Sequence, residues 1–489
     1  MTAINLSRAP GMTDEGPVRA QGLNDTLLIA TGSTVGQLLV VIAMPVITRL
    51  YEPTELGLYA IFSALVGLFA TVVALHYELA IPLPRSDSQA RVLTKIALLT
   101  VGGMGLLAIG AILALGDVLF KRFNSPELSA VQWLIPASLT TSGIITVLTY
   151  RAIRIKAYRL TAIGKVLQGI VQPCAQMLYG ILGYGASGLI YGSLVGQCAT
   201  VYALVQNGFG REIRYGWHSH KTKFVALAGK YKNFPTISTP SSFINAAVTQ
   251  LPVIALAAWF DMRIVGLYAL GARILQVPMR FIGDSLSQVF FSQAASAFRN
   301  GTLCEVVLKT WRVQTTFALH TFLPVAIVAP EVFGNVFGQT WREAGVYTQL
   351  LMPWIMASFV STSLSILVTI LQKQKQEFVF QVIYLSVLPC TLWFARFETS
   401  GHLAIGLLGG VASALLAGKI IWLLTIAGVQ VRFQSTWLAR EILYVTAAIS
   451  VLLFIKIVGG SEMVTLCAAA VLVVGMHGVN HLVRNAYSF

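Results

Sequence analysis

The side chains best placed to bind a charged ligand lie inside an apolar stretch at about 264–290. Arg273, Arg280 and Asp284 occur there at positions i, i+7 and i+11, with Gln276 beside them. At about 100° per residue of helix, the three charged side chains fall within roughly 20° of one line. Because charge is costly in an apolar stretch, this line indicates either internal pairing or the binding of a ligand.

The three charges differ in how they can be neutralised. Arg280 and Asp284 are one helical turn apart and can pair, so they have a structural as well as a functional interpretation. Arg273 has no acid three or four residues away on either side. It therefore needs a partner on another helix, water or an anionic ligand, and we expect it to face an internal cavity.

Lys419 is a second cation within an apolar stretch, at 403–427. A lysine in such a place can extend its chain to a polar surface, or it can contribute to the same cavity as Arg273. A cavity with excess positive charge favours a phosphate-bearing or acidic substrate.

Neutral polar side chains follow one face of another stretch, at 236–258. Ser238, Ser242, Asn245 and Thr249 recur there at i, i+4, i+7 and i+11. Small and hydroxylated residues often hold membrane helices together, so helix packing is one interpretation. The other is a cavity wall on which Ser242 and Asn245 hydrogen-bond the hydroxyls of a sugar.

These polar residues stand out because the chain as a whole is apolar. Of its 489 residues, 56% are hydrophobic and 11% are charged, whereas a soluble protein carries about 25% charged residues. Apolar segments long enough to span a bilayer, about 20 residues each, recur along the chain. They predict an all-α membrane protein with about 14 transmembrane helices around a central cavity. The expected spans lie at 27–48, 57–81, 96–119, 130–150, 161–182, 188–206, 236–258, 264–290, 313–333, 346–371, 378–395, 403–427, 441–456 and 463–483.

The net charge of +15 reflects 34 Lys and Arg against 19 Asp and Glu. The most basic segments, 151–159 and 211–232, fall on the same side of the membrane as the N-terminus when the spans are counted. Cytoplasmic loops carry such an excess of Lys and Arg. We therefore expect a multi-pass protein with both termini in the cytoplasm, and the charge requires no nucleic-acid partner.

A short repeat relates two parts of the chain. Gly57-Leu-Tyr-Ala60 recurs as Gly266-Leu-Tyr-Ala269, and the same offset carries span 27–48 onto 236–257. An even number of spans separates the copies, which predicts two parallel-related halves with ligand sites between them. The expected organisation is a cytoplasmic tail at 1–26, an N-terminal half of six spans at 27–206, a basic cytoplasmic linker at 207–235, a C-terminal half at 236–395, and the last three spans with a short tail at 396–489.

Other motifs contribute little. Gly183-Tyr-Gly-Ala-Ser-Gly188 matches a dinucleotide-binding fingerprint but lies in a turn between two spans and not in a βαβ unit. The five cysteines form no CxxC or Cys/His cluster, so we expect neither a metal site nor a cofactor. No catalytic motif occurs, and the longest expected outside loop, around 333–345, is short for a membrane-embedded glycan enzyme. We therefore expect a transporter with no catalytic residues.

The segment Thr48-Arg-Leu-Tyr-Glu-Pro-Thr-Glu-Leu-Gly-Leu-Tyr59 resembles the Wzx-type polysaccharide (O-antigen/exopolysaccharide) flippases. These form the polysaccharide transport branch of the multidrug/oligosaccharidyl-lipid/polysaccharide exporter superfamily. Tyr77-Glu-Leu-Ala-Ile81, Lys232-Asn-Phe-Pro235 and Gly266-Leu-Tyr-Ala-Leu270 resemble further segments of the same family. The resemblance covers at least residues 25–295.

The resemblance implies a flippase in the bacterial cytoplasmic (inner) membrane. Its cargo would be undecaprenyl-diphosphate-linked oligosaccharide repeat units, moved by alternating access to the periplasmic leaflet for exopolysaccharide or lipopolysaccharide biosynthesis. Membrane lipid, a polysaccharide polymerase and chain-length proteins are the implied partners. A drug or metabolite-cation antiporter of the same superfamily is the alternative, although a cationic cavity would repel such cargo.

Some members of the resembled family couple transport to an ion gradient. In this chain the first expected span, 27–48, contains no carboxylate, which departs from a carboxylate-based ion site. The candidate coupling residues are Glu78, Asp117 and Glu331, which lie near or within other spans.

Overall fold

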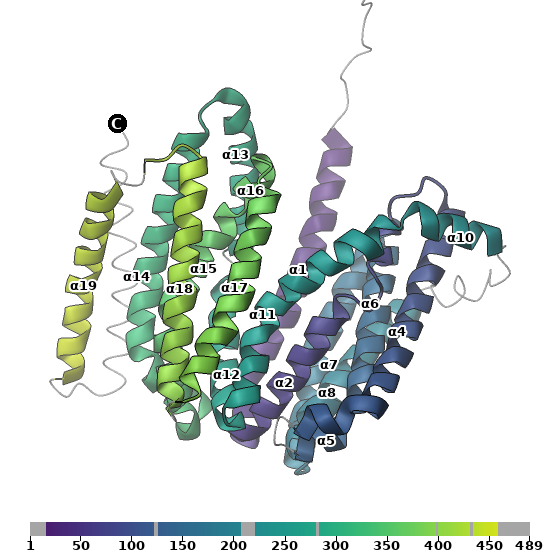
Figure 1. Ribbon diagram of the computed structural model, residues 1–489, viewed down its shortest axis with the longest axis horizontal. Coiled ribbons are helices and arrows are strands. Elements are labelled where there is room, and N and C mark those ends of the chain that lie inside the picture. The colour runs from purple at the N-terminus through teal and green to yellow at the C-terminus, as the bar shows by residue number, and fades with distance from the viewer. Residues whose placement is uncertain are drawn as a thin grey trace, which may run out of the picture.

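The chain folds into helices that form two lobes (Figure 1). The structure is a computed structural model, which describes residues 16–121, 126–206, 221–279, 283–397, 400–430 and 434–457. These residues contain no β-strand. Each expected span from 27–48 to 441–456 contains a helix, whereas 463–483 lies outside the described residues. The predicted all-α fold class is confirmed.

The N-terminal lobe consists of the helices up to residue 204, most of which lie on the right of Figure 1. They are α1 (Gly16–Leu50), α2 (Pro53–Ala70), α3 (Tyr77–Ala80), α4 (Asp87–Lys121), α5 (Pro126–Val131), α6 (Leu134–Arg154), α7 (Tyr158–Ile181) and α8 (Gly185–Leu204). Helix α7 packs against α1 and α8. Its contact with α1 is close, because a Cβ atom at Gly169 would overlap the backbone of Gly36.

The C-terminal lobe follows a connection that crosses between the lobes. The connection comprises α10 (Lys221–Lys230), the π-helix η2 (Phe234–Ser238) and α11 (Thr239–Trp259). The lobe comprises α12 (Met262–Pro278), α13 (Asp284–Asn300), α14 (Leu303–Phe337), the 3₁₀ turn η4 (Gln339–Trp341), α15 (Arg342–Leu364), α16 (Ile366–Ile370), α17 (Gln374–Ala395), α18 (Gly401–Ile426) and α19 (Ser435–Ile457). Helix α11 packs against α2 of one lobe and α17 of the other.

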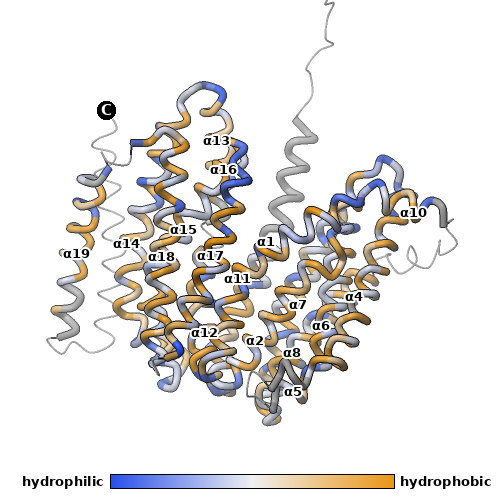
Figure 2. Tube along the Cα trace, viewed as in Figure 1, coloured by the Kyte–Doolittle hydropathy of each residue, from blue (hydrophilic) through white to orange (hydrophobic). Residues whose placement is uncertain are grey.

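Apolar residues run along most of the length of the helices, and hydrophilic residues gather near their ends (Figure 2). Eight of the described segments are long and apolar enough to cross a membrane. One of them, Asp87–Gly116, is only 28% buried inside the protein, and its Leu106, Leu107 and Leu113 are largely exposed. An apolar surface of this kind suits contact with lipid tails. The eight segments are Thr31–Leu50, Pro53–Ala70, Asp87–Gly116, Phe234–Trp259, Leu303–Phe337, Gln339–Ile370, Gln374–Ala395 and Gly401–Ile426.

One expected span is shorter in the structure than predicted. The span expected at 57–81 ends earlier, because α2 stops at Ala70 and Leu75 and His76 adopt left-handed backbone conformations, with φ of 50° and 57°. The span expected at 264–290 contains α12, which ends at Pro278, and the first part of α13, which begins at Asp284; residues 280–282 between them lie outside the described residues.

The two copies of the repeat lie against each other. Helix α2 packs on α12, and they approach most closely at Gly57 and Gly266. A Cβ atom at Gly57 would overlap the carbonyl oxygen of Met262, and one at Gly266 would overlap that of Pro53. Only glycine allows two backbones to come so near. The prediction of two related halves is confirmed, and the repeat marks their line of contact.

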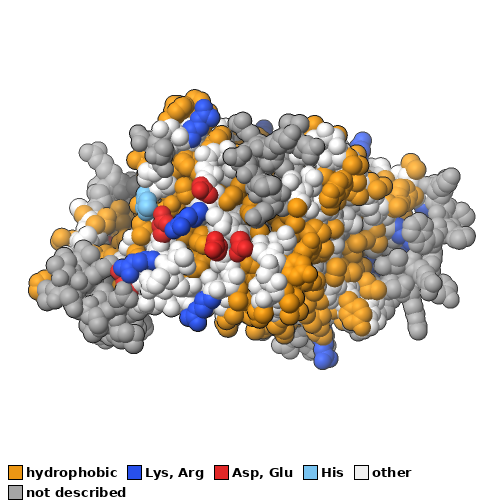
Figure 3. Space-filling model, turned by 90° about the horizontal axis from the view of Figure 1, so that it is seen from below, with side chains coloured by type: hydrophobic (Ala, Val, Ile, Leu, Met, Phe, Trp, Pro, Cys, Tyr) orange, Lys and Arg blue, Asp and Glu red, His pale blue; other side chains and the backbone are white. Residues whose placement is uncertain are grey.

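The lobes meet at the end of the molecule that carries the α1–α2 and α11–α12 turns, the lower end in Figure 1, which we call the closed end. There the fully buried Trp341 donates a hydrogen bond from Nε1 to the carbonyl oxygen of Thr48, at 2.8 Å. Seen from below, most of the visible charged side chains gather over the C-terminal lobe beside a large apolar area (Figure 3). Arg263 at the start of α12 pairs with Glu343, with Nη2 and Oε2 3.2 Å apart. The lobes diverge toward the opposite, open end.

Candidate functional site

A cavity of about 1100 Å³ lies between the lobes. Helices α1, α2 and α7 line it from one side, and α12, α15, α17 and α18 line it from the other, with α11 between them. Its wall is rich in amides and hydroxyls: Ser33, Gln37, Ser63, Gln168, Gln172, Asn245, Thr249, Gln250, Gln276, Ser358, Thr362 and Gln381. Such a wall can hydrogen-bond a polar ligand at many points.

Three cations and one anion line the cavity: Lys165, Arg273, Lys419 and Glu377. Lys419 Nζ and Glu377 Oε1 form an ion pair of 2.5 Å, with side chains 14% and 18% exposed. Neither Lys165 nor Arg273 has a hydrogen bond or ion pair to another described residue. The cavity therefore carries two positive charges that the described protein groups leave unneutralised.

These two cations come from different lobes. Lys165 lies on α7 of the N-terminal lobe, and Arg273 lies on α12 of the C-terminal lobe. Tyr59 and Tyr268, which are equivalent in the repeat, also line the cavity from the two sides. Gln172 Nε2 donates a hydrogen bond to the hydroxyl of Tyr59, at 3.2 Å. The site is thus built jointly by both halves.

The predicted site residues are only partly brought together. Arg273, Gln276, Lys419 and Asn245 line the cavity. Arg280 lies outside the described residues, and Asp284 is the first residue of α13. The predicted line of Arg273, Arg280 and Asp284 along one helix passes through residues outside the described part of the chain and stays a prediction.

The polar residues of α11 lie in two different environments. Asn245 and Thr249 line the cavity, and the Thr249 hydroxyl donates to the carbonyl oxygen of Asn245, at 3.2 Å. Ser242, one turn earlier, contacts His76 instead: its Oγ lies 2.7 Å from His76 Nε2. Ser242 is therefore a contact between α11 and the N-terminal lobe and not part of the cavity wall.

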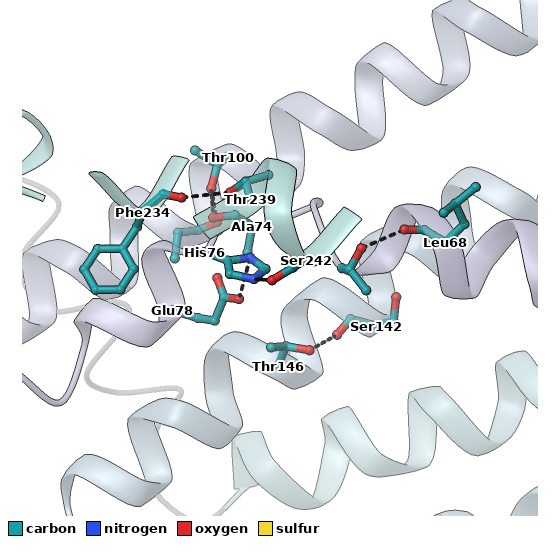
Figure 4. A network of polar contacts seen from close by, with 12 residues as sticks. Leu68, Ala74, His76, Glu78, Thr100, Ser142, Thr146, Phe234, Thr239 and Ser242 are labelled. Carbon is teal, nitrogen blue, oxygen red and sulfur yellow. Dashed lines mark hydrogen bonds and ion pairs between the residues drawn. The ribbon is translucent and has the colours of Figure 1, made fainter. Parts of the chain in front are cut away.

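Of the three candidate coupling residues, Glu78 and Glu331 are not part of the cavity wall. Glu78 is buried on α3, and Asp117 lies near the end of α4. Glu331 is buried on α14, where its Oε1 pairs with Arg342 at 3.5 Å. Glu78 adjoins His76, and His76 contacts Ser242 of α11 (Figure 4).

Lys165 and Glu377 were missed by the sequence analysis. Lys165 lies within the expected span 161–182, so its charge in an apolar stretch was a usable signal. Glu377 precedes the expected span 378–395 by one residue, and its pairing with Lys419 is a tertiary contact. The amides of α1 and α7 had no distinguishing pattern in the sequence.

The fold is shared with solved membrane transporters. The lipid II flippase MurJ in an inward closed conformation matches with a TM-score of 0.70 at 10% identity, over 93% of this chain and 99% of that chain. A multidrug resistance MATE family transporter of the MOP superfamily, in an inward-facing conformation, matches with a TM-score of 0.57 at 14% identity, over 83% and 94%. No curated protein matches the sequence.

Two lobes around a polar cavity in an all-helical chain with apolar helices of membrane-spanning length form a fold of the class seen in these two solved transporters. Within that class, the chain belongs to the family described as polysaccharide biosynthesis protein, whose family model matches residues 46–346. The matched region contains the repeat, α7 and α12, and hence both unneutralised cations of the cavity. The resemblance to the polysaccharide transport branch is confirmed.

Proposed function

We propose that this protein is a flippase for polyprenyl-diphosphate-linked oligosaccharides, and that Lys165 and Arg273 together bind the diphosphate. The observation that carries the proposal is the pair of unneutralised cations facing one cavity from both lobes. A diphosphate that links a lipid to a sugar carries about two negative charges, which these two cations match. Like-charge repulsion disfavours a cationic drug in the same cavity.

The rest of the cavity suits the sugar part of such a cargo. Amide and hydroxyl side chains, among them Gln168, Asn245 and Gln276, can exchange hydrogen bonds with sugar hydroxyls. Aromatic rings of Tyr59 and Trp354 offer flat apolar surfaces for the faces of sugar rings. A volume of about 1100 Å³ exceeds that of most small-ligand pockets, about 300–1000 Å³.

The proposed membrane location and orientation follow from the proposed cargo. We place the protein in the bacterial cytoplasmic membrane with both termini in the cytoplasm, so that the open end faces the cytoplasm. The cargo, an undecaprenyl-diphosphate-linked repeat unit, would enter there and leave to the periplasmic leaflet for a polymerase and chain-length proteins. The family description, polysaccharide biosynthesis, supports this assignment.

The test is complementation in a strain that lacks the gene. The wild-type chain should restore surface polysaccharide, and Arg273→Ala should lower it at least tenfold while lipid-linked repeat units accumulate. Arg299→Ala is the matched control, because Arg299 is exposed on α13 and is not part of the cavity wall. Normal polysaccharide from Arg273→Ala, at equal protein in the membrane, would contradict the role given to Arg273.

A further inference from the structure

A buried His–Glu pair lies in the connection between α2 and α4, outside the candidate spans Pro53–Ala70 and Asp87–Gly116. His76 Nδ1 and Glu78 Oε1 are 3.7 Å apart, and their side chains are 12% and 7% exposed. Figure 4 shows the imidazole between Glu78 on one side and Ser242 of α11 on the other. The pair thus places a titratable group in contact with α11, a helix that lines the cavity.

The pair is incompletely hydrogen-bonded. Among the described residues, neither His76 Nδ1 nor Glu78 Oε2 has a hydrogen-bond partner, although both atoms are buried. Leaving a buried carboxylate short of partners disfavours its charged form. Burial accordingly raises the pKa of Glu78 to about 7 and lowers the pKa of His76. The pair can therefore exchange a proton near neutral pH.

Few other ionisable groups lie on the helices next to the His76–Glu78 pair. Helix α6 contributes the Tyr150 phenol, which interacts electrostatically with Glu78. Asp87 on α4 is already paired with Arg151 of α6, at 2.8 Å. The π-helix η2 and α11 contain no ionisable side chain. The remaining ionisable groups on α3, α4 and α6 are Tyr77, whose hydroxyl donates to the Ala228 carbonyl, Arg91, Lys95, Asp117, Lys121 and Arg154. Tyr231, just after α10, packs on the same apolar cluster as Tyr77.

Ser242 connects this pair to the cavity. It lies in the first turn of α11, and Asn245 and Thr249 on the same helix line the cavity. Helix α11 also packs on α17 of the C-terminal lobe. The His76–Ser242 contact therefore fixes the beginning of a helix that both lobes share.

We propose that His76 and Glu78 form a proton-binding site that controls the attachment of α11 to the N-terminal lobe. As a carboxylate, Glu78 favours the imidazole tautomer with hydrogen on Nδ1, so that Nε2 accepts the hydrogen bond of the Ser242 hydroxyl. Binding of one proton converts the Glu78 carboxylate to the neutral acid and removes the charge that orients the ring. The Ser242 hydrogen bond then weakens, and α11 is released. The inference rests on the proposed flippase function only in naming the proton as its coupling ion.

The test measures the position of α11 without any cargo. Spin labels at Ile237 and Leu115, both exposed, are placed in a cysteine-free variant held in lipid nanodiscs. Their distance distribution is recorded by pulsed electron resonance while the pH is changed from about 5 to 8. We expect two populations in the wild-type chain, with an interconversion midpoint near neutral pH.

Three variants decide the outcome. Glu78→Gln, which mimics the protonated acid, should hold the released population at every pH, and Ser242→Ala should do the same through the other end of the contact. Glu441→Gln is the matched control, because Glu441 Oε2 and His320 Nε2 form a second buried pair, 3.5 Å apart, away from α11. It should retain the wild-type midpoint. The proposal would be overturned if the label distances in the wild-type chain did not change with pH. It would also be overturned if the distances in Glu78→Gln still changed with pH.

This measurement is independent of the cargo. If the label distance follows pH as expected but lipid-linked sugar does not move, the proton site stands and the proposed flippase function fails. If sugar moves while the distance is insensitive to pH, the reverse holds.

Discussion

At the scale of single residues, the function depends on which cavity charges are already neutralised. The sequence indicates Lys419 as a second candidate cation beside Arg273, but Glu377 of α17 pairs with Lys419 of α18. Lys165 takes its place as the second unneutralised cation. The sequence can show that a charged residue lies in an apolar stretch, but only the tertiary structure shows its ion-pair partner on another helix.

The Lys419–Glu377 pair should be structural. Glu377→Gln would leave Lys419 without its anion at a position only 14% exposed, and breaking a buried pair costs about 3 kcal/mol. We expect a lower unfolding temperature for Glu377→Gln and for Lys419→Gln in detergent. The exchange Glu377→Lys with Lys419→Glu should recover most of the loss, and an unchanged unfolding temperature in the single variants would contradict this role.

At the scale of helices, the repeat has a physical meaning that its four residues alone did not reveal. Gly57 and Gly266 were predicted to open equivalent spans, and they do so in α2 and α12. The contact between the two glycines is a tertiary contact, which the sequence alone does not show.

The glycine contact gives a prediction of its own. Gly57→Ala or Gly266→Ala would force a methyl group into a carbonyl oxygen of the opposite helix, and overpacking of this kind costs about 3 kcal/mol or more when backbone must move. We expect poor folding or a strongly lowered unfolding temperature. Gly102→Ala on α4 is the control, because a Cβ atom there meets nothing within 4 Å. Equal stability of all three variants would show that α2 and α12 are not in close contact.

At the scale of the whole molecule, the all-α class, the two related halves and the central cavity could be predicted from apolar segments and one repeat. The composition of the cavity wall could not. Its amides come from α1, α7, α11, α12 and α17, and residues so far apart in the chain share no spacing rule. The contact of His76 with Ser242 likewise joins positions 166 residues apart.

We propose that two cations of the cavity, one from each lobe, bind the diphosphate of a lipid-linked sugar. Purified protein in liposomes, given a fluorescent polyprenyl-diphosphate sugar, tests it most directly. We expect the wild-type chain to move this lipid between leaflets and Arg299→Ala to match it. The Lys165→Ala, Arg273→Ala double variant should move the lipid at least a hundredfold more slowly. Equal rates for the double variant and the wild type, or no movement by the wild type, would contradict it.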